Sequence, residues 1–399
     1  TKRCRENRGA GVTERDEGDR LTETDVLVVG GGVVGCCAAY YLARWGVDVA
    51  VIDRDGINGQ ASGVNAGSLH LMTVSRFFKS RDPLWVAGRN RLLPLVKAAV
   101  ETWRELAGEV DRDIELVLDG GLMVAETEGQ LRMLEEKAEE ERSHGLNVDV
   151  VTGSDLGTIA PYVSDSVIGA AFCAKEGKVN PILATGAVAR GAERAGARFL
   201  QGTELLALET DGAGFEARTS RGDIRCHRVI DAAGAGAGAV AAMVGVRLPI
   251  ESHARHMNVT EAAPPLIKHL VQHSDRMLSM KQAARGNVVI GGGWPAAFDT
   301  ATGRPDVIKK SIKGNLGVAR SVVPGLGPLR LLRTWAGMLT LTPDGDAILG
   351  EVPGVPGFYL AVPPNPGFTG APICGRLLAE RIAGKSTTFD LEAFSVERF

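Results

Sequence analysis

The sequence predicts an α/β protein in which a Rossmann-like domain, assembled from separated segments, is joined to an α+β domain with an antiparallel sheet. Two observations support this prediction. Residues 24–53 have the pattern of a strand, a glycine-rich turn, a helix and a second strand, which is the order of a βαβ unit. Residues 250–293 contain several short alternating runs separated by turn residues, as is typical of antiparallel strands.

The glycine-rich turn predicts a bound dinucleotide. It follows the apolar run Val26–Val29, which is short and β-branched like a buried strand. Gly30, Gly32 and Gly35 fit the pattern G-x-G-x-x-G, in which the glycines allow a tight turn, the approach of a pyrophosphate and close helix packing. The helix expected over residues 33–45 would direct free N–H groups and the positive end of its dipole at the phosphates.

Asp53 indicates which dinucleotide is bound. It closes the second strand, 23 residues after Gly30. A carboxylate at this place accepts hydrogen bonds from both ribose hydroxyls of an adenosine and repels a 2′-phosphate. NADP is therefore disfavoured.

Composition limits the function classes. The chain has 399 residues, 44% of them hydrophobic, and a formal net charge of −3, which predicts two or three domains and disfavours nucleic acid or anionic membrane as a partner. It has neither an apolar run of bilayer length nor a secretory signal, so a cytoplasmic protein that acts on a small molecule is expected. The six cysteines have no metal-binding spacing, so no metal site is expected, and Cys36 with Cys37 are interpreted as helix packing residues.

The pattern of elements predicts how the chain divides. Residues 1–23 form a charged arm, residues 24–80, 150–245 and 333–399 form the dinucleotide domain, and residues 81–149 and 246–332 form the substrate domain. Helices are expected over residues 84–106, 128–144, 182–195 and 369–382, and strands over residues 114–118, 121–125, 197–200, 204–209, 229–231 and 358–362.

Three further blocks give the chain a family resemblance. They are residues 60–70 (QASGVNAGSLH), residues 231–236 (DAAGAG), and residues 334–350 with the helix start Gly367-Phe-Thr. In their order and spacing the chain resembles the D-amino-acid oxidase superfamily of FAD-dependent amine and amino-acid oxidoreductases. It looks most like the flavin subunits of bacterial opine oxidases, D-hydroxyproline and proline dehydrogenases and hydrogen cyanide synthase.

The resemblance implies a glutathione-reductase type of Rossmann-like domain with FAD as the cofactor. The residues implied in FAD binding lie at the glycine-rich turn, the ribose acid, the 60–70 loop and three later segments. They are Gly30, Gly32, Val33, Val34, Gly35, Asp53, Arg54, Ala61, Ser62, Asn65, Ala66, Gly67, Ser68, Leu205, Ala233, Gly234, Gly337, Gly367, Phe368 and Thr369.

The resemblance also implies residues near the flavin ring. His70, Lys281 and His256 are the polar residues expected there, with Gln282 as the alternative to Lys281 if the register differs by one. His70 either contacts the substrate or holds its own loop by a hydrogen bond.

The substrate carboxylate is expected to bind in an unusual way. Glycine oxidase-like members have an arginine shortly after Trp-x-Gly, where this chain has Met338 and Leu339. Arg255 and Arg333, together with Trp335, are therefore the candidate substrate residues.

The expected activity is oxidation of the C–N bond of an amino acid or secondary amine (an opine, a proline-like compound, glycine or a D-amino acid) to an imine by hydride transfer to flavin N5. Two alternatives stay open. The chain could be a non-catalytic or electron-relay flavoprotein subunit, or a 2-hydroxy acid dehydrogenase on the same scaffold. Partner subunits of a hetero-oligomeric dehydrogenase are implied by the resemblance.

Overall fold

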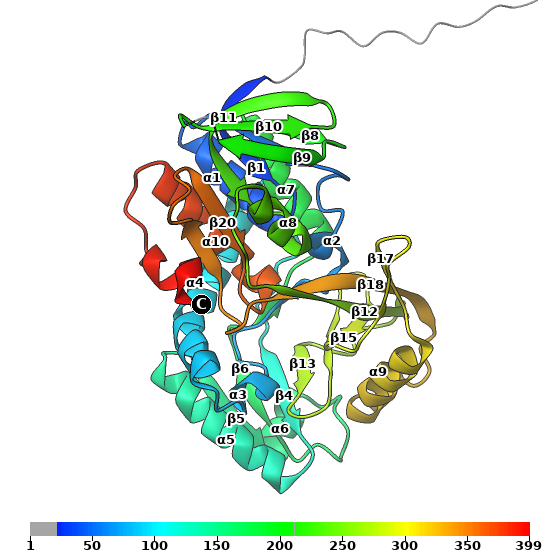
Figure 1. Ribbon diagram of the computed structural model, residues 1–399. Coiled ribbons are helices and arrows are strands. Elements are labelled where there is room, and N and C mark those ends of the chain that lie inside the picture. Colours follow the sequence, from blue (N-terminus) through cyan, green and yellow to red (C-terminus); the bar gives the residue numbers. More distant parts are fainter. Residues whose placement is uncertain (1–21, 211) are drawn as a thin grey trace, which may run out of the picture.

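The computed structural model describes residues 22–210 and 212–399 of the chain (Figure 1). Two eight-stranded sheets organise these residues, one at each end of the molecule (Figure 1). The expected α/β class is confirmed, and residues 1–21 of the expected N-terminal arm lie outside the described part of the chain.

The first sheet is assembled from widely separated segments, as predicted. Its strands lie in the order β19-β20-β11-β1-β2-β8, and β10 and β9 continue from β11. All neighbours from β20 to β8 pair in parallel, and β19, β9 and β10 pair antiparallel. The strands are β1 (Glu23–Val29), β2 (Val49–Asp53), β8 (Arg198–Gln201), β9 (Leu205–Thr210), β10 (Phe215–Thr219), β11 (Gly222–Asp231), β19 (Ile348–Glu351) and β20 (Phe358–Val362).

Helix α1 (Val33–Arg44) is the central helix of this half. Its residues from Val33 to Ala43 are all buried, because α1 packs against α7 (Pro181–Arg194), α10 (Gly367–Ile382) and β2. Cys36 and Cys37 lie within this core, and burial raises the pKa of both thiols. A raised pKa is the behaviour of packing residues, since a redox thiol requires a lowered one.

The second sheet has the strand order β18-β12-β15-β14-β13-β4-β6-β5 and is antiparallel except for the β13–β4 pair. Its strands are β4 (Gly121–Ala125), β5 (Val148–Thr152), β6 (Gly169–Cys173), β12 (Glu251–Ala262), β13 (Leu270–His273), β14 (Ser279–Gln282), β15 (Asn287–Gly291) and β18 (Leu331–Leu341). Helices α9 (Lys309–Val322) and α6 (Gly153–Ile159) cover one face, where their apolar side chains join those of β13, β14 and β15.

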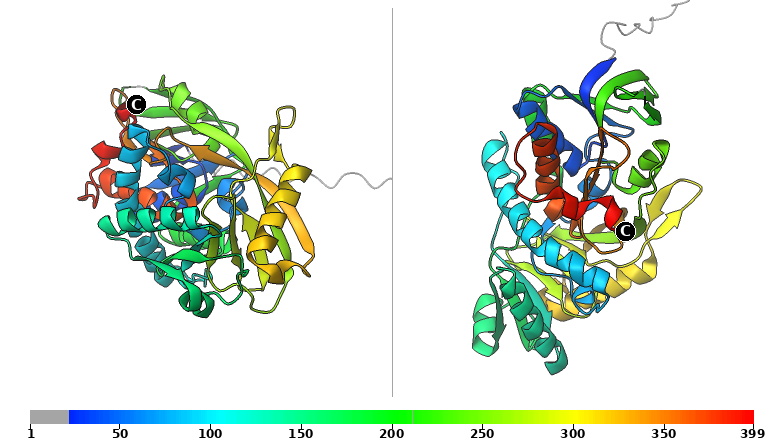
Figure 2. Two further views of the ribbon diagram at one scale, coloured as in Figure 1. Left: turned by 90° about the horizontal axis from the view of Figure 1, so that it is seen from below. Right: turned by 60° about the vertical axis from the view of Figure 1, so that its left-hand side comes forward.

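Helix α4 (Pro83–Glu109) connects the two halves (Figure 2). It packs on α10, and one apolar cluster contains its side chains together with those of α1, β4 and α5 (Glu128–Ser143). Asp82 caps α4 by accepting a hydrogen bond from Leu84 N at 2.9 Å, and Pro83 occupies its first turn, where proline is tolerated. The two halves therefore share part of one core.

Strand pairing differs from the predicted division in several places. β6, most of β5 and β18 belong to the second sheet, whereas the sequence pattern places residues 150–245 and 333–399 in the dinucleotide domain. Residues 114–118 form no strand: Val117 makes only an isolated bridge to Lys178, and Glu115 has a φ of 56°. Apolar patterning does not identify the partners of a strand, which explains the first difference, and a short apolar run can also occur outside a strand, which explains the second.

The short elements complete the description. They are α2 (Ala61–Val64), β3 (Ser68–Leu69), α3 (Ser75–Phe78), β7 (Gly177–Lys178), α8 (Ala237–Met243), β16 (Ala297–Asp299) and β17 (Arg304–Asp306), together with short 3-10 turns. Within the described ranges, no helix is both long and apolar enough to cross a bilayer.

Candidate functional site

The glycine-rich turn joins β1 to α1, and two of its glycines are required by the packing of the protein itself. Gly30 has a φ of 114°, and a Cβ there would lie 2.4 Å from the Ala232 carbonyl oxygen. A Cβ on Gly35 would lie 2.1 Å from the Gly30 carbonyl oxygen. A Cβ on Gly32 would meet only the Ser62 hydroxyl, at 3.0 Å, so the backbone at Gly32 is the part of the turn open to a ligand.

The start of α1 is suited to an anion. Its N-cap residue Gly32 has no side chain to cap the helix, and no acidic residue lies in the first turn. Val33 N donates to Ser62 Oγ at 2.9 Å, which fixes α2 beside the helix start. Uncapped N–H groups and the helix dipole favour a pyrophosphate here.

Asp53 lies at the end of β2, next to the turn. Its Oδ2 accepts from Gly31 N at 2.8 Å, and its Oδ1 accepts from Asp55 N at 2.9 Å and Gly56 N at 3.0 Å. A carboxylate has about four lone-pair sites, so Asp53 can still accept from a ribose hydroxyl. Arg54 is exposed beside Asp55, and Leu205 is buried at the start of β9.

The 60–70 loop is braced by Asn65 and by a glycine. Asn65 Oδ1 accepts from Gly67 N at 2.6 Å, and its Nδ2 donates to the Ala61 carbonyl at 3.0 Å. Gly67 has a φ of 69°, and a Cβ on it would lie 2.1 Å from the Val179 carbonyl oxygen. The loop, which includes Ala66 and the buried Ser68, is thereby pressed against the segment before α7.

Asp231, which begins the 231–236 block but is not among the predicted cofactor residues, is a buried acid at the end of β11. Burial raises the pKa of its carboxyl to about 8, against the lowering effect of a hydrogen bond from Ala233 N at 3.1 Å. Its Oδ2 has no partner among the described atoms. Ala233 and Gly234, which are expected to contact the cofactor, lie two and three residues further on. The free Oδ2 of Asp231 therefore belongs to the segment of the predicted cofactor site.

The start of α10 is the other helix start at this site, and the end of the 60–70 loop is hydrogen-bonded to it. No side chain caps it. Thr369 Oγ1 accepts from His70 N at 3.0 Å and donates to the Ser68 carbonyl at 3.3 Å. The Phe368 ring stacks on Trp103, and Gly367 begins the helix. The N–H groups of this first turn could stabilise negative charge on a flavin ring.

Residues from four strands of the second sheet form one wall of the site. Paired residues of antiparallel strands share a face, so Trp335, Met257, Gly291 and Ser279 form a row across β18, β12, β15 and β14. Trp335 Nε1 donates to the Val64 carbonyl at 2.7 Å, which fixes this face of the sheet against α2.

Two of the predicted polar residues meet this wall. His70 Nε2 lies 3.3 Å from Ser279 Oγ. Lys281 Nζ is buried and donates to the Gly67 carbonyl at 3.1 Å and the Val179 carbonyl at 2.8 Å. Burial lowers the pKa of Lys281 to about 7.

Glu176 is a second buried acid that no sequence motif indicates. Its Oε1 accepts from Leu71 N at 2.7 Å and Met72 N at 2.8 Å, so it holds the backbone that follows His70. Its Oε2 lies 4.0 Å from His70 Nδ1, and neither atom has a hydrogen-bond partner in the described part of the chain. Only the fold reveals this pair, because 106 residues separate the two positions.

Other predicted residues lie elsewhere. His256 is buried on the opposite face of β12, where its Nε2 lies 3.1 Å from Asn258 Nδ2 beside α9. Gln282 also turns from the wall, since its Oε1 accepts from Leu266 N and Ile267 N. Arg333 is exposed near the start of β18, on the face of Trp335.

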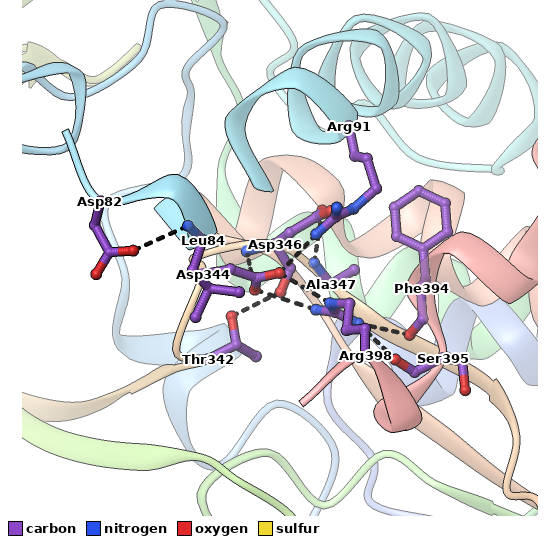
Figure 3. Close-up of polar contacts among 10 residues, drawn as sticks. All are labelled: Asp82, Leu84, Arg91, Thr342, Asp344, Asp346, Ala347, Phe394, Ser395 and Arg398. Atoms are coloured by element: carbon purple, nitrogen blue, oxygen red, sulfur yellow. Dashed lines mark hydrogen bonds and ion pairs between the residues drawn. The ribbon is translucent and has the colours of Figure 1, made fainter. Parts of the chain in front are cut away.

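A buried charge cluster supports the loop before α10 (Figure 3). Asp344 and Asp346, both with fully buried side chains, are bound by Arg91 of α4 at 2.7 and 2.9 Å, and Arg398 binds Asp344 at 2.8 Å (Figure 3). Burial raises the pKa of Asp346 to about 6. Asn365 N donates to the Gly345 carbonyl at 2.9 Å, so the cluster holds the segment that leads into α10.

Taken together, the residues fit FAD. Gly32 leaves the turn open at one uncapped helix start, the 60–70 loop runs between the two helix starts, and Asp231 Oδ2 offers an unused polar atom. These features match a dinucleotide whose pyrophosphate lies at α1 and whose ring system reaches α10.

The chain is similar in sequence and in structure to known amine and amino-acid oxidases. The β subunit of sarcosine oxidase from Rhizobium meliloti (strain 1021) is 26% identical over 94% of this chain and 88% of that protein. An opine oxidase subunit from Rhizobium meliloti is 26% identical over 95% of this chain and 98% of its own length. The crystal structure of glycine oxidase from Geobacillus kaustophilus superposes with a TM-score of 0.85 at 26% identity, covering 95% of this chain and all of that one.

The family itself follows from the match of residues 25–381 to the DAO family, described as FAD dependent oxidoreductase. That match covers most of the chain and includes both sheets. The chain therefore belongs to the DAO family of FAD-dependent oxidoreductases, as its motifs predicted, and FAD is its cofactor.

Proposed function

We propose that this enzyme oxidises the C–N bond of an amino acid or a secondary amine to an imine, which water then hydrolyses. The observation that supports it most is the position of His70 and Ser279, whose side chains meet on the sheet wall while the His70 backbone is bound to the first turn of α10. When bound, FAD supplies the acceptor for the hydride.

The chain's own residues would prepare the reaction. The α10 start would stabilise negative charge that develops beside its N–H groups. Trp335 and Lys281 hold the wall against the cofactor loop through the Val64 and Gly67 carbonyls, which fixes the distance between substrate and cofactor. No side-chain nucleophile is needed for this chemistry.

An anaerobic substrate panel tests the proposal. The purified yellow protein is mixed with sarcosine, glycine, proline, hydroxyproline, D-amino acids, opines and 2-hydroxy acids, and the flavin absorbance is followed. We expect bleaching by at least one amine. Bleaching by 2-hydroxy acids alone would instead support the dehydrogenase alternative, and no bleaching, alone or with co-purified partners, would support a non-catalytic subunit.

We also propose that the chain works with partner subunits. Two of its relatives are named as subunits, of sarcosine oxidase and of opine oxidase. Co-expression with neighbouring gene products followed by size-exclusion chromatography should yield a larger complex. Full turnover by a homogeneous single chain would contradict this.

A further inference from the structure

Two arginines at the substrate wall have no carboxylate partner among the described residues. Arg255 lies on β12, opposite Gly337 of β18 and therefore on the face of Trp335 and Met257. Its Nη1 donates only to the Ala254 carbonyl at 3.1 Å, and its Nε is buried without a partner in the described ranges. Arg76, in α3, keeps part of its surface exposed, and its guanidinium lies over the Phe77 ring.

Both arginines reach the same strip of backbone. Arg76 Nη1 lies 3.2 Å from the position of a Cβ on Gly293, and the backbone of Arg255 pairs with Pro295, two residues further on. Burial, and to a lesser extent the positive charge of Arg255, lowers the pKa of Arg76. Burial alone lowers the pKa of Arg255.

Several other partly buried arginines bind a carboxylate of the chain itself. Arg91 and Arg398 each contact a buried aspartate, and Arg89 contacts Glu140 at 2.6 Å. Like charges that are partly removed from water without a counter-ion are unfavourable, so a pair left this way indicates that an anion comes from outside the chain.

The place of the pair relates it to the substrate. Met338 and Leu339 stand where the resemblance places the carboxylate-binding arginine, and Leu339 lies on the same face of the sheet as Arg255, one same-face pair along from Gly337. Arg255, which lies on the strand next to β18, can therefore bind a carboxylate of the substrate. Arg76 adds a second positive charge near Gly293. A monocarboxylate would neutralise one of these two charges and leave the other.

We infer that Arg76 and Arg255 form an anion clamp that selects amines bearing two anionic groups, such as N-carboxyalkyl amino acids, over simple monocarboxylic amino acids. This inference rests on the proposed function for the identity of the amine. The clamp itself requires only an anion of double charge.

A matched pair of substrates tests the clamp. Sarcosine and iminodiacetate differ only in that a carboxylate replaces hydrogen on the N-methyl group. We expect anaerobic reduction by iminodiacetate to be favoured at least about tenfold in kcat/KM, because charge-assisted hydrogen bonds contribute on this scale. The preference should be lost in Arg76→Gln and Arg255→Gln. It should be kept in Arg285→Gln, which changes an exposed arginine in the β14–β15 turn.

A binding experiment separates the clamp from the activity. Titration calorimetry of the holoprotein with malonate and acetate should show malonate binding about tenfold tighter or more, again only while both arginines are present. Lysine variants at both positions keep the charge and guard against loss of fold. Equal affinity for malonate and acetate, or an equal loss in Arg285→Gln, would overturn the inference. Malonate selectivity without reduction by any amine would retain the clamp and reject the proposed function.

Discussion

Asp53 shows at the residue scale how one side chain serves both fold and ligand. Its carboxylate accepts two backbone hydrogen bonds from the turn after β2 and one from Gly31 of the glycine-rich turn, and it also stands where an adenosine ribose is expected. Its replacement should therefore affect the local turn and FAD together.

For Asp53→Ala we expect FAD retention to weaken by about 1 to 3 kcal/mol, the cost of leaving buried polar partners unpaired. Titration of the apoprotein with FAD, followed by flavin fluorescence, measures this. Asp53→Asn is the matched control, since it keeps the shape and one acceptor oxygen and should lose less. An unchanged dissociation constant for Asp53→Ala would refute the assignment.

Asp231 gives a pH dependence with a definite sign. Its folded pKa of about 8 lies above the ordinary value of 3.8, so the folded protein binds the extra proton between these pH values. The Asp231 contribution to the free energy of unfolding is therefore fully present below pH 4 and falls as the pH rises toward 8, by up to about 1.4 kcal/mol per pH unit.

Asp231→Asn should remove this slope. Urea unfolding of the wild type and the variant between about pH 5 and 8 measures it, and the difference in unfolding free energy should change steadily in favour of the variant as the pH rises. A difference that is constant across this range would show that Asp231 is ionised in the folded protein.

At the scale of elements, α10 depends on the loop before it. The buried carboxylates of Asp344 and Asp346 are neutralised by Arg91 from α4 and by Arg398 near the C-terminal end of the described chain (Figure 3). Segments far apart in sequence thus fix one helix start.

Arg91→Gln should destabilise the protein by roughly 3 to 5 kcal/mol, because it leaves the buried Asp346 carboxylate without its ion-pair partner and Asp344 with Arg398 alone. Denaturant unfolding measures this loss. The double variant Arg91→Gln/Asp346→Asn should recover part of the loss, since the uncompensated charge is then removed. Strictly additive effects would show that Arg91 and Asp346 do not interact.

At the scale of the whole molecule, the cofactor loop meets the second sheet where α2 contacts β18. Trp335 Nε1 bonds the Val64 carbonyl, and Gly337 is so close to Val64 that a Cβ on Gly337 would lie 2.4 Å from Val64 Cγ2. The spacing between cofactor loop and substrate wall is therefore set by this contact.

Gly337→Ala should push the wall from the cofactor loop, at a cost typical of overpacking, about 1 to 3 kcal/mol. We expect a lower melting temperature and weaker FAD retention. Gly337→Ala/Val64→Ala removes the colliding methyl group and should restore both properties. If the double variant were no better than Gly337→Ala, the contact with Val64 would not be the cause.

The sequence alone determined the βαβ unit, the antiparallel strands after residue 250, the family and the cofactor. The strands and the βαβ unit follow from local periodicity and from turn glycines such as Gly30 and Gly35, whereas the family and the cofactor follow from the resemblance of the motif blocks. The membership of β6 and β18 in the second sheet was decided only by the tertiary structure, because strand partners are chosen by long-range packing.

The same reason explains the site. The pairs His70–Glu176 and Arg76–Arg255 join residues far apart in the chain, so no spacing in the sequence could reveal them. The position of the His256 side chain beside α9 could not be predicted from the sequence either. Neighbouring residues of a strand face opposite sides of the sheet, but the sequence does not show which side faces the cofactor. Local chemistry fixed what the chain binds, and the register of distant strands fixed which side chains face it.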